Sequence, residues 1–429
     1  MNKKININFN RMEKIIIILL TIITVRCSSS DSGPNPDPNP KPTETIEADA
    51  SIINVAEQKQ LIRGFGAATV FDPPGVSELN TSDYDKLFGN NEGQIGLSIL
   101  RIRVATDDNY RSKELNRAKS AKARGAIVIA CPWSPPASMK TNNNLIGGSL
   151  KTESYEDYAN YLNDFASYMT ANNAGLYAIG VQNEPDIQVS YESCDWTAFQ
   201  IRDFFKDYGH LITNTKVISP ESFNFNHTTT DPMLNDDMAS SNVDIVGGHI
   251  YGSGLTDYPL ARSKGKEVWM TEHLDTEITW DAVFATGKEI HDCMTIGNFN
   301  AYIWWYAKRF YGPLGEDGVI TKRGYVMSNY SKFIRPNFVR VDATANPKTN
   351  IYVSAFNGNG KTVIVAINTG TSNVNQQFAI KGTTVTSITP YVTSESEDLV
   401  TKAPIDLNPD IDAFKFTLPP KSITTFVSN

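Results

Sequence analysis

The sequence contains little cysteine, with four residues in a chain of 429. Three of them, Cys131, Cys194 and Cys293, lie beyond the amino-terminal region, and their spacing matches no metal-binding pattern. Their odd number argues against a full disulfide framework. Cys131 lies in an apolar stretch, so we expect a small buried side chain there. The sequence therefore predicts neither a metal site nor a cofactor.

Basic clusters and glycine-rich phosphate loops are also missing. The formal net charge is −8, and no block of Lys and Arg follows the amino terminus, so nucleic acid is not an expected partner. No glycine-rich phosphate turn follows the first predicted strand of the main domain. This absence argues against an open, doubly wound sheet that binds nucleotides.

The apolar run near the amino terminus is short. It extends from Ile15 to Val25 and follows four basic residues, Lys3, Lys4, Arg11 and Lys14. Its length fits the core of a secretory signal and is too short to span a membrane. We therefore predict a signal peptide over residues 1–26.

Residues 27–45 are predicted to be a tether. Cys27, followed by a Ser-rich stretch, resembles a bacterial lipoprotein signal, in which this Cys becomes the lipidated first residue; Arg26 departs from the small residue usual before it. The Pro-rich tract to Pro42 favours an extended spacer. The resemblance implies a lipid anchor as the only membrane contact, at the cell envelope on the outer face of an outer membrane. A secreted or periplasmic protein is the alternative.

Eight strand-like runs alternate with helical patterns between residues 64 and 334. This alternation is typical of a (β/α)₈ barrel, an α/β fold in which the carboxyl ends of the parallel strands carry the chemistry. An open doubly wound sheet is the alternative. The predicted strands span residues 66–71, 98–104, 126–130, 176–181, 216–219, 244–249, 267–271 and 301–306.

The sequence changes character after residue 334. Short runs of alternating apolar residues, separated by turns rich in Thr, Ser, Asn and Gly, predict an antiparallel β-sandwich over residues 335–429. The predicted strands span residues 339–341, 351–356, 362–367, 377–380, 385–392 and 414–418. Before the barrel, Ser51–Val55 and Gln60–Ile62 predict a short hairpin or paired strands.

Two glutamates end two of the predicted barrel strands. Glu184 lies in Asn183-Glu184-Pro185 after the fourth strand, and Glu272 lies in Thr271-Glu272-His273 at the end of the seventh. Strands four and seven face each other across a barrel mouth, so both carboxylates can point at one substrate bond. Cleavage of a glycosidic bond needs such a pair. A glutamate that merely caps a turn is the alternative for either residue alone.

These motifs resemble those of glycoside hydrolase family 30. The segments Cys131–Lys140, Trp304–Gly312 and Lys322–Ser328 resemble its glucuronoxylanase branch more specifically. The resemblance implies a retaining enzyme with Glu184 as acid/base and Glu272 as nucleophile, whose carboxyl groups should lie about 5 Å apart. It also implies that residues 46–63 add strands to the side domain. Glu221, at the end of strand five, is the chief rival for a catalytic role.

Other polar residues at the strand ends complete the candidate site. Asn183 is expected to bond the sugar 2-hydroxyl. Arg103, with the same parity as Arg101 on strand two, is expected to keep the nucleophile ionised, although a structural ion pair is the alternative. His249 and Tyr251 end strand six and are expected to contact the nucleophile or the reacting sugar; for His249 a core histidine bonded to backbone is the alternative.

Aromatic residues cluster at the same ends and suit the apolar faces of sugar rings. Trp304 and Trp305 follow each other on one strand, so they cannot both face the cavity. We assign Trp133 and Trp305 to the cleft.

The branch resemblance also implies a contact to a glucuronic acid substituent. Arg309 would pair the carboxylate through its planar fork, with Tyr311 adding a hydroxyl. Leu274 and Glu277 depart from the Tyr and Ser that the branch uses for the same sugar. The alternative is that Arg309 pairs with Glu316 or Asp317.

The resemblance thus predicts an endo-β-1,4-xylanase that acts on xylan or glucuronoxylan, as a monomer. A β-1,6-glucanase or a glucosylceramidase-like enzyme would use the same two glutamates. A surface glycan-binding lipoprotein without catalysis is the alternative from another class.

Overall fold

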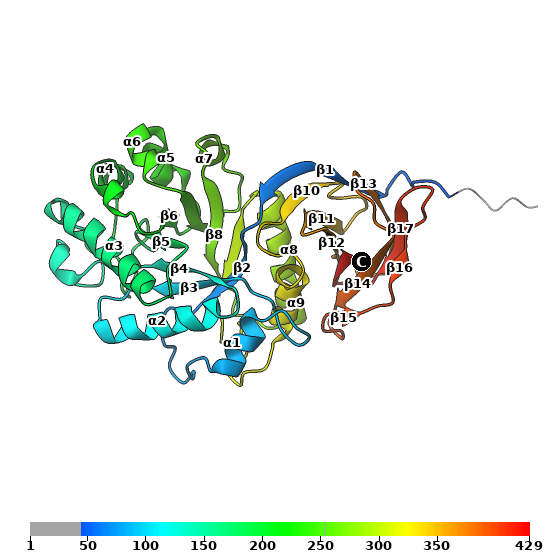
Figure 1. Ribbon diagram of the computed structural model, residues 1–429, viewed down its shortest axis with the longest axis horizontal. Coiled ribbons are helices and arrows are strands. Elements are labelled where there is room, and N and C mark those ends of the chain that lie inside the picture. Colours follow the sequence, from blue (N-terminus) through cyan, green and yellow to red (C-terminus); the bar gives the residue numbers. More distant parts are fainter. Residues whose placement is uncertain (1–43, 253) are drawn as a thin grey trace, which may run out of the picture. The chain divides into compact units, whose positions relative to one another are not determined.

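The computed structural model describes residues 44–252 and 254–429 (Figure 1). The predicted signal peptide, Cys27 and all but the last two residues of the predicted tether lie outside these ranges. Within them, no helix combines the length and the apolar character needed to cross a bilayer.

The main domain is a closed barrel of eight parallel strands, which confirms the predicted (β/α)₈ fold. Each strand falls on one of the eight predicted runs, and the last strand pairs with the first to close the ring. The strands are β2 (Gly64–Ala68), β3 (Ile99–Arg103), β4 (Ile127–Cys131), β5 (Ala178–Gly180), β6 (Lys216–Ser222), β7 (Ile245–His249), β8 (Glu267–His273) and β9 (Ala301–Trp304).

Helices connect the strands and cover the outside of the barrel (Figure 1). Several begin at a side chain that caps the first turn; Asn80 and Asp83 form a capping box on α1, and Thr197 and Gln200 form one on α4. The helices are α1 (Thr81–Phe88), α2 (Asp108–Lys122), α3 (Tyr155–Ala171), α4 (Ala198–Tyr208), α5 (His227–Asn235), α6 (Asp237–Ser241), α7 (Pro259–Ser263), α8 (Trp280–Thr295) and α9 (Lys322–Ser331).

The lower part of the barrel interior is filled by an apolar cluster. Its fully buried members come from most of the strands: Ile99, Ile129, Ala178, Ile218, Ile245, Trp269, Ala301 and Ile303. Side chains alternate along a strand, so Ile99 and Arg101 share the inward face of β3. The interior is therefore apolar at the level of Ile99 and charged in the next layer, at Arg101. This charged layer lies toward the carboxyl ends of the strands.

The side domain is one sheet folded on itself. Its order is β15-β14-β18-β12-β11-β10-β1-β13-β17, with β16 paired to β14. Phe378 of β13 and Phe426 of β18 are far apart in this order, yet their rings lie 5.0 Å apart, so the sheet forms two layers. The strands are β1 (Ser51–Leu61), β10 (Val339–Ala343), β11 (Ile351–Gly358), β12 (Lys361–Asn368), β13 (Val374–Lys381), β14 (Ser387–Thr393), β15 (Val400–Thr401), β16 (Ile405–Asp406), β17 (Ala413–Leu418) and β18 (Ser422–Ser428).

Three details of this sheet differ from the sequence-based expectation. The two predicted runs before the barrel form the single strand β1, which pairs antiparallel with β10 and parallel with β13. The pairing of β1 with β13 is parallel, whereas the other described strand pairs of this sheet are antiparallel. The sequence pattern also missed β18, which lies between β12 and β14 near the middle of the sheet.

The barrel contacts the side sheet through α8 and α9. The Asn329 amide donates to the Thr393 hydroxyl at 2.7 Å, and the Thr425 hydroxyl donates to the Asn329 carbonyl at 2.7 Å. Gly287 of α8 leaves no room for a side chain, because a Cβ there would lie 2.1 Å from Ile423 Cδ1. The three cysteines of the described chain are free and buried.

Candidate active site

Glu184 and Glu272 meet at the carboxyl ends of β5 and β8. One carboxylate oxygen of each glutamate and one ring nitrogen of His249 all lie within 4.8 Å of one another. Both glutamates are buried, with 5% and 7% of their surface exposed. The separation suits a retaining pair, in which the carboxyl groups lie about 5 Å apart, and leaves too little room for the water of an inverting enzyme.

The backbone holds Glu184 and Glu221 in strained positions. Both have positive φ angles, 46° and 53°, a region that non-glycine residues rarely adopt. The Glu184 amide donates to the Glu221 carbonyl at 3.0 Å, which locks the ends of β5 and β6 together. Strain of this kind persists only where the surrounding structure enforces it, and it is common at functional sites.

Arg101 organises the charges around Glu272. Its guanidinium donates to Glu272 Oε2 at 2.5 Å, to Glu221 Oε2 at 2.7 Å and to Asn183 Oδ1 at 2.7 Å. Burial alone would lower the pKa of Arg101, but the charges of Glu221 and Glu272 raise it above its ordinary value. Arg101 is therefore a permanent positive charge beside Glu272. The Tyr251 hydroxyl donates to the other oxygen of Glu272, at 3.1 Å.

Arg101, and not Arg103, contacts the expected nucleophile Glu272. Arg103 pairs instead with Glu192 of the loop after β5, at 2.6 Å, and lies over the ring of Phe71. Both arginines point inward, as their parity predicts, but an extended Arg side chain spans about two residues of strand rise. The guanidinium at the level of Glu272 therefore belongs to Arg101, whose backbone lies further from the mouth of the barrel than that of Arg103.

Glu184 contacts His249 and Tyr191. His249 Nδ1 lies 2.8 Å from Glu184 Oε1, and the Tyr191 hydroxyl donates to Glu184 Oε2 at 3.2 Å. Burial alone would lower the pKa of His249, but the charge of Glu272, the hydrogen bond to Glu184 and the carboxylate of Glu221, 3.9 Å from Nε2, raise it to about 9. His249 is therefore protonated at neutral pH and contacts the expected acid/base, not the expected nucleophile.

Glu221 lies behind this pair. It is fully buried, and although burial would raise its pKa, Arg101 and His249 lower it to about 2. A carboxylate that stays ionised and enclosed cannot deliver a proton to a substrate. This environment argues against the rival catalytic role for Glu221 and makes it a fixed negative charge in the cluster.

The same three side chains, Glu184, His249 and Glu272, are close enough to share a cation. His249 would first have to release its proton, because a metal binds the neutral imidazole. With the pKa of His249 raised to about 9, this set suits proton chemistry better than metal binding.

An aromatic cleft of about 530 Å³ opens above the two glutamates. Trp133 and Trp305 line it, as expected, with ring centroids 5.6 Å apart, whereas Trp304 is buried on the opposite side of its strand. The remaining lining residues are Phe71, Tyr191, Glu192, Phe223, Tyr251, Leu274 and Tyr306.

Arg309 and Tyr311 do not line this cavity. Arg309 lies 3.3 Å from Glu316, which is the alternative pairing that the sequence left open. Tyr311 is mostly buried, and Glu277 is exposed. The structure therefore gathers eight of the predicted residues at the mouth of the barrel and leaves the two candidate branch contacts in the neighbouring loop.

Sequence reasoning missed Tyr191, Glu192, Phe223 and Arg323. The first two lie in the long loop after Pro185, where no periodic pattern places a side chain. Arg323 of α9 donates to the carbonyls of Asp275, Glu277 and Tyr311, at 2.9, 2.8 and 2.6 Å, and so ties together the loops that follow β8 and β9. The sequence offered one signal for Arg323, namely its position in the Lys322–Ser328 motif.

Comparisons with known proteins agree with this geometry. Residues 103–281 match the glycosyl hydrolase family 30 TIM-barrel domain, and residues 339–426 match the family's beta sandwich domain. Glucuronoxylanase XynC of Bacillus subtilis (strain 168) is 42% identical over 400 residues, which cover 90% of this chain and 93% of that protein.

Solved structures show the same relation. A family 30 subfamily 8 xylanase from Clostridium acetobutylicum superposes with a TM-score of 0.84 at 44% identity, over 89% of this chain and 100% of that one. A family 30 endoxylanase from Clostridium papyrosolvens C71 gives 0.81 at 41% identity, over 89% and 100%. The chain is therefore an O-glycosyl hydrolase and belongs to glycosyl hydrolase family 30.

Proposed function

We propose that the chain is a retaining endo-β-1,4-xylanase that acts on glucuronoxylan. The observation that carries this proposal is the carboxylate pair within 4.8 Å at the floor of an aromatic cleft. The similarity to proteins described as a glucuronoxylanase and as xylanases supports the substrate.

In the first step, Glu184 gives its proton to the glycosidic oxygen while Glu272 attacks the anomeric carbon. The carbon–oxygen bond to the leaving chain breaks, and an ester forms between the sugar and Glu272. Arg101 and Tyr251 hold the two oxygens of Glu272 and orient the carboxylate for attack. Because Asn183 accepts from Arg101 through its oxygen, its amide NH₂ is the group that remains for the sugar 2-hydroxyl.

In the second step, Glu184 takes a proton from a water molecule, which attacks the anomeric carbon from the side that the leaving chain vacated. The ester bond breaks, the electron pair returns to Glu272, and the product keeps the original anomeric configuration.

The buried charges balance in both states. The cluster holds three carboxylates, Glu184, Glu221 and Glu272, and two cations, Arg101 and His249. When Glu184 carries its proton, two negative charges face two positive ones. After glycosylation Glu272 is a neutral ester and Glu184 is ionised, so the count is again two against two. Low dielectric makes any imbalance costly, so this arrangement favours the proton cycle that the mechanism needs.

Anomeric NMR tests the mechanism directly. The first products released from xylan should have the β configuration. Glu272→Ala should lower kcat by roughly a thousandfold or more, because no group replaces the nucleophile. Azide should partly restore its activity and give an α-glycosyl azide. First products of inverted configuration would contradict the proposal.

Branch recognition is the finer part of the proposal. Arg309 carries a full positive charge in the loop after β9, and its pairing with Glu316 is partly exposed. A glucuronate can therefore replace Glu316 as its partner. A charged bidentate contact contributes about 1.5–3 kcal/mol.

Arg309→Ala should consequently lower kcat/KM on glucuronoxylan by about ten- to a hundredfold and leave linear xylan nearly unaffected. Glu316→Gln is the matched control, since it frees Arg309 and should preserve or increase the preference for the branched polymer. Equal losses on both polymers in Arg309→Ala would rule out branch recognition through this residue.

We further propose that a lipid on Cys27 holds the enzyme at the cell envelope, with the Pro-rich tract as spacer, so that the polymer is met outside the cell. Detergent-phase partitioning tests the anchor. The native protein should enter the detergent phase and Cys27→Ala should remain in the aqueous phase; partitioning of the variant would refute the anchor.

A further inference from the structure

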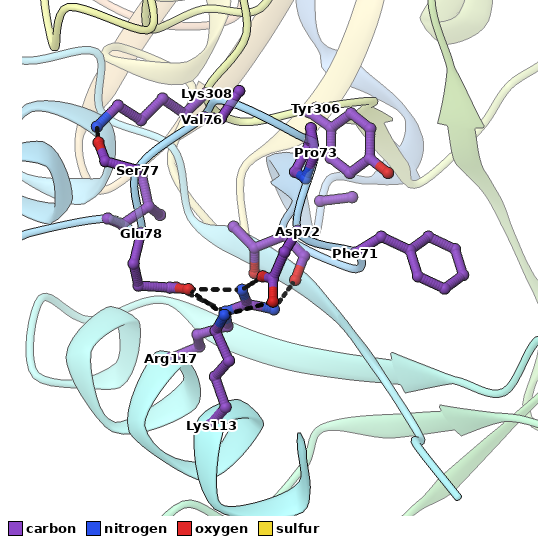
Figure 2. A pocket seen from close by; sticks show the side chains of 13 residues that line it. Phe71, Asp72, Pro73, Val76, Ser77, Glu78, Lys113, Arg117, Tyr306 and Lys308 are labelled. Atoms are coloured by element: carbon purple, nitrogen blue, oxygen red, sulfur yellow. Dashed lines mark hydrogen bonds and ion pairs between the residues drawn. The ribbon is translucent and has the colours of Figure 1, made fainter. Parts of the chain in front are cut away.

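A second cavity, of about 170 Å³, lies beside the catalytic cleft. It is enclosed by the loop between β2 and α1, by α2 and by the first residues after β9. Phe71 and Tyr306 line both this cavity and the cleft, so the two spaces adjoin. Figure 2 shows these two aromatic side chains at the right, and Ser77 with Lys308 at the left.

The charged residues of this cavity are paired with one another. Arg117 and Lys113 of α2 both reach the carboxylates of Asp72 and Glu78, at 2.6–2.8 Å (Figure 2). The third cation, Lys308, contacts Asp83 at 2.8 Å. Arg117 also pairs with the fully buried Glu114 at 2.9 Å. Each cation of the lining therefore has a carboxylate partner, and the cavity offers no unmatched positive charge for an acidic sugar.

The network also fixes the shape of the loop. Arg117 is almost fully buried, and besides its carboxylates it donates to the Thr69 carbonyl at 2.6 Å. One side chain of α2 thus holds both ends of the loop segment from Thr69 to Glu78. The cavity is therefore set in place before any ligand arrives, which reduces the entropy cost of binding.

The lining also has an apolar part. Pro73, Val76 and Leu79 line the cavity together with Phe71 and Tyr306, the aromatic residues that it shares with the cleft. Charged and apolar groups together suit a ligand with hydroxyls at its edge and carbon–hydrogen faces, which is the chemistry of a sugar ring.

We propose that this cavity binds one neutral sugar unit of the xylan chain held in the cleft, an inference that rests on the proposed function. Its volume corresponds to about five or six water molecules, which suits one sugar ring and not an oligosaccharide. Matched carboxylates and ammonium groups bond hydroxyls, and the apolar wall takes the carbon face of the ring. The unit is either a neutral pentose branch or a backbone xylose beyond the catalytic subsites.

Two substrate series separate these sources. The first is xylo-oligosaccharides of increasing length that all carry one glucuronic acid branch; the second is oligosaccharides of fixed length that carry the same branch, with and without a neutral arabinose branch. For each series we compare kcat/KM of the native enzyme, Val76→Ala and Val76→Phe. The first variant removes part of the apolar wall, and the second fills the cavity from its loop.

Val76→Ala should reduce the ratio of kcat/KM between the substrate that reaches the cavity and the one that does not by about two- to tenfold, because the sugar ring loses apolar contact. Val76→Phe should abolish that preference. The affected series, length or branch, identifies the sugar unit. Val400→Phe on β15, an exposed change of the same kind in the side domain, should leave both ratios at the native value.

Unchanged ratios in both variants, in both series, would overturn the inference, and so would equal losses on all substrates. If the native enzyme cleaves none of these substrates, the proposed function itself fails, which is a separate result.

Discussion

Glu221 and His249 tune the site from behind the catalytic pair. Neither residue has surface through which to reach a polymer, yet both carry charges that depend on their buried neighbours. Arg101 and His249 lower the pKa of Glu221 to about 2, while Glu272, Glu184 and Glu221 raise the pKa of His249 to about 9, against the effect of burial in each case. The folded protein therefore binds protons at these two residues differently from the unfolded chain.

The two shifts predict a window of maximal stability. The lowered pKa of Glu221 stabilises the fold above about pH 4.5 and loses its effect as the pH falls toward 2. The raised pKa of His249 stabilises the fold below about pH 6.5 and loses its effect as the pH rises through 9. The contribution of this cluster to the free energy of unfolding should therefore be largest between about pH 4.5 and 6.5.

Urea unfolding of the native protein, Glu221→Gln and His249→Gln measures this effect. The destabilisation caused by Glu221→Gln should shrink toward about pH 3, and that caused by His249→Gln should shrink toward about pH 10. Differences that do not change with pH would show that the two side chains contribute only packing.

The positions of Glu184 and Glu272 were predictable from the sequence because their determinants are local. A strand that ends in Asn-Glu-Pro or Thr-Glu-His places a carboxylate at the barrel mouth whatever the rest of the chain does. The sequence could not decide which of Arg101 and Arg103 contacts Glu272. Their positions on the strand show that both side chains point inward, but not how far each guanidinium reaches toward the mouth of the barrel. Tyr191 was hidden for the same reason, because it reaches Glu184 from an aperiodic loop.

At the scale of elements, the loops after β8 and β9 form one unit. Arg323, at the start of α9, donates to carbonyls of both loops and lies over the ring of Trp304. Leu274 of the cleft belongs to the first loop and Arg309 to the second. The position of Arg309 relative to the cleft thus depends on Arg323, a side chain that touches neither Arg309 nor the cleft.

Arg323→Gln should therefore lower kcat/KM on glucuronoxylan by roughly ten- to a hundredfold, and on linear xylan by less, because loop displacement removes the alignment between Arg309 and the cleft. The neighbouring Lys322→Gln is the control, because Lys322 contacts Asp398 and the carbonyls of Ser394 and Glu397 in the side domain and donates to neither loop. Parallel losses on the two polymers would indicate a general effect on folding.

Two strands differ from the sequence-based expectation for a common physical reason. β18 carries two buried threonines between Ile423 and Phe426, and the Thr425 hydroxyl donates to Asn329 on α9, so its composition resembles that of a turn. β1 carries an exposed polar stretch in its middle, where its register against β10 shifts twice. Tertiary partners, absent from the local pattern, made β18 a strand and joined the two predicted runs into β1.

At the scale of the whole molecule, the barrel and the side sheet share a buried surface. The contacts of Asn329 and the close approach of Gly287 to Ile423 leave little space between α8, α9 and β18. Unfolding of either domain would expose this surface on the other. We therefore expect one cooperative thermal transition for both.

Calorimetry of the native protein should show a single peak. Gly287→Val should lower its Tm by several degrees without splitting it, because the added atoms displace Ile423 and strain both domains. Ala285→Val, on the exposed face of the same helix, should change the Tm little. Two resolved peaks in the native protein would contradict this coupling.

The pairing of β1 with β10 and β13 has a consequence for biosynthesis. Roughly 280 residues separate β1 from β10, so at about 5–20 residues per second β1 waits tens of seconds on the ribosome for its first partner. During this interval it is an open edge that another nascent chain can pair with. The exposed Glu57 and Lys59 in its middle oppose such pairing, since charges on a strand edge discourage foreign partners. The polar stretch that obscures β1 in the sequence thus protects the growing polypeptide from aggregation until the side domain is complete.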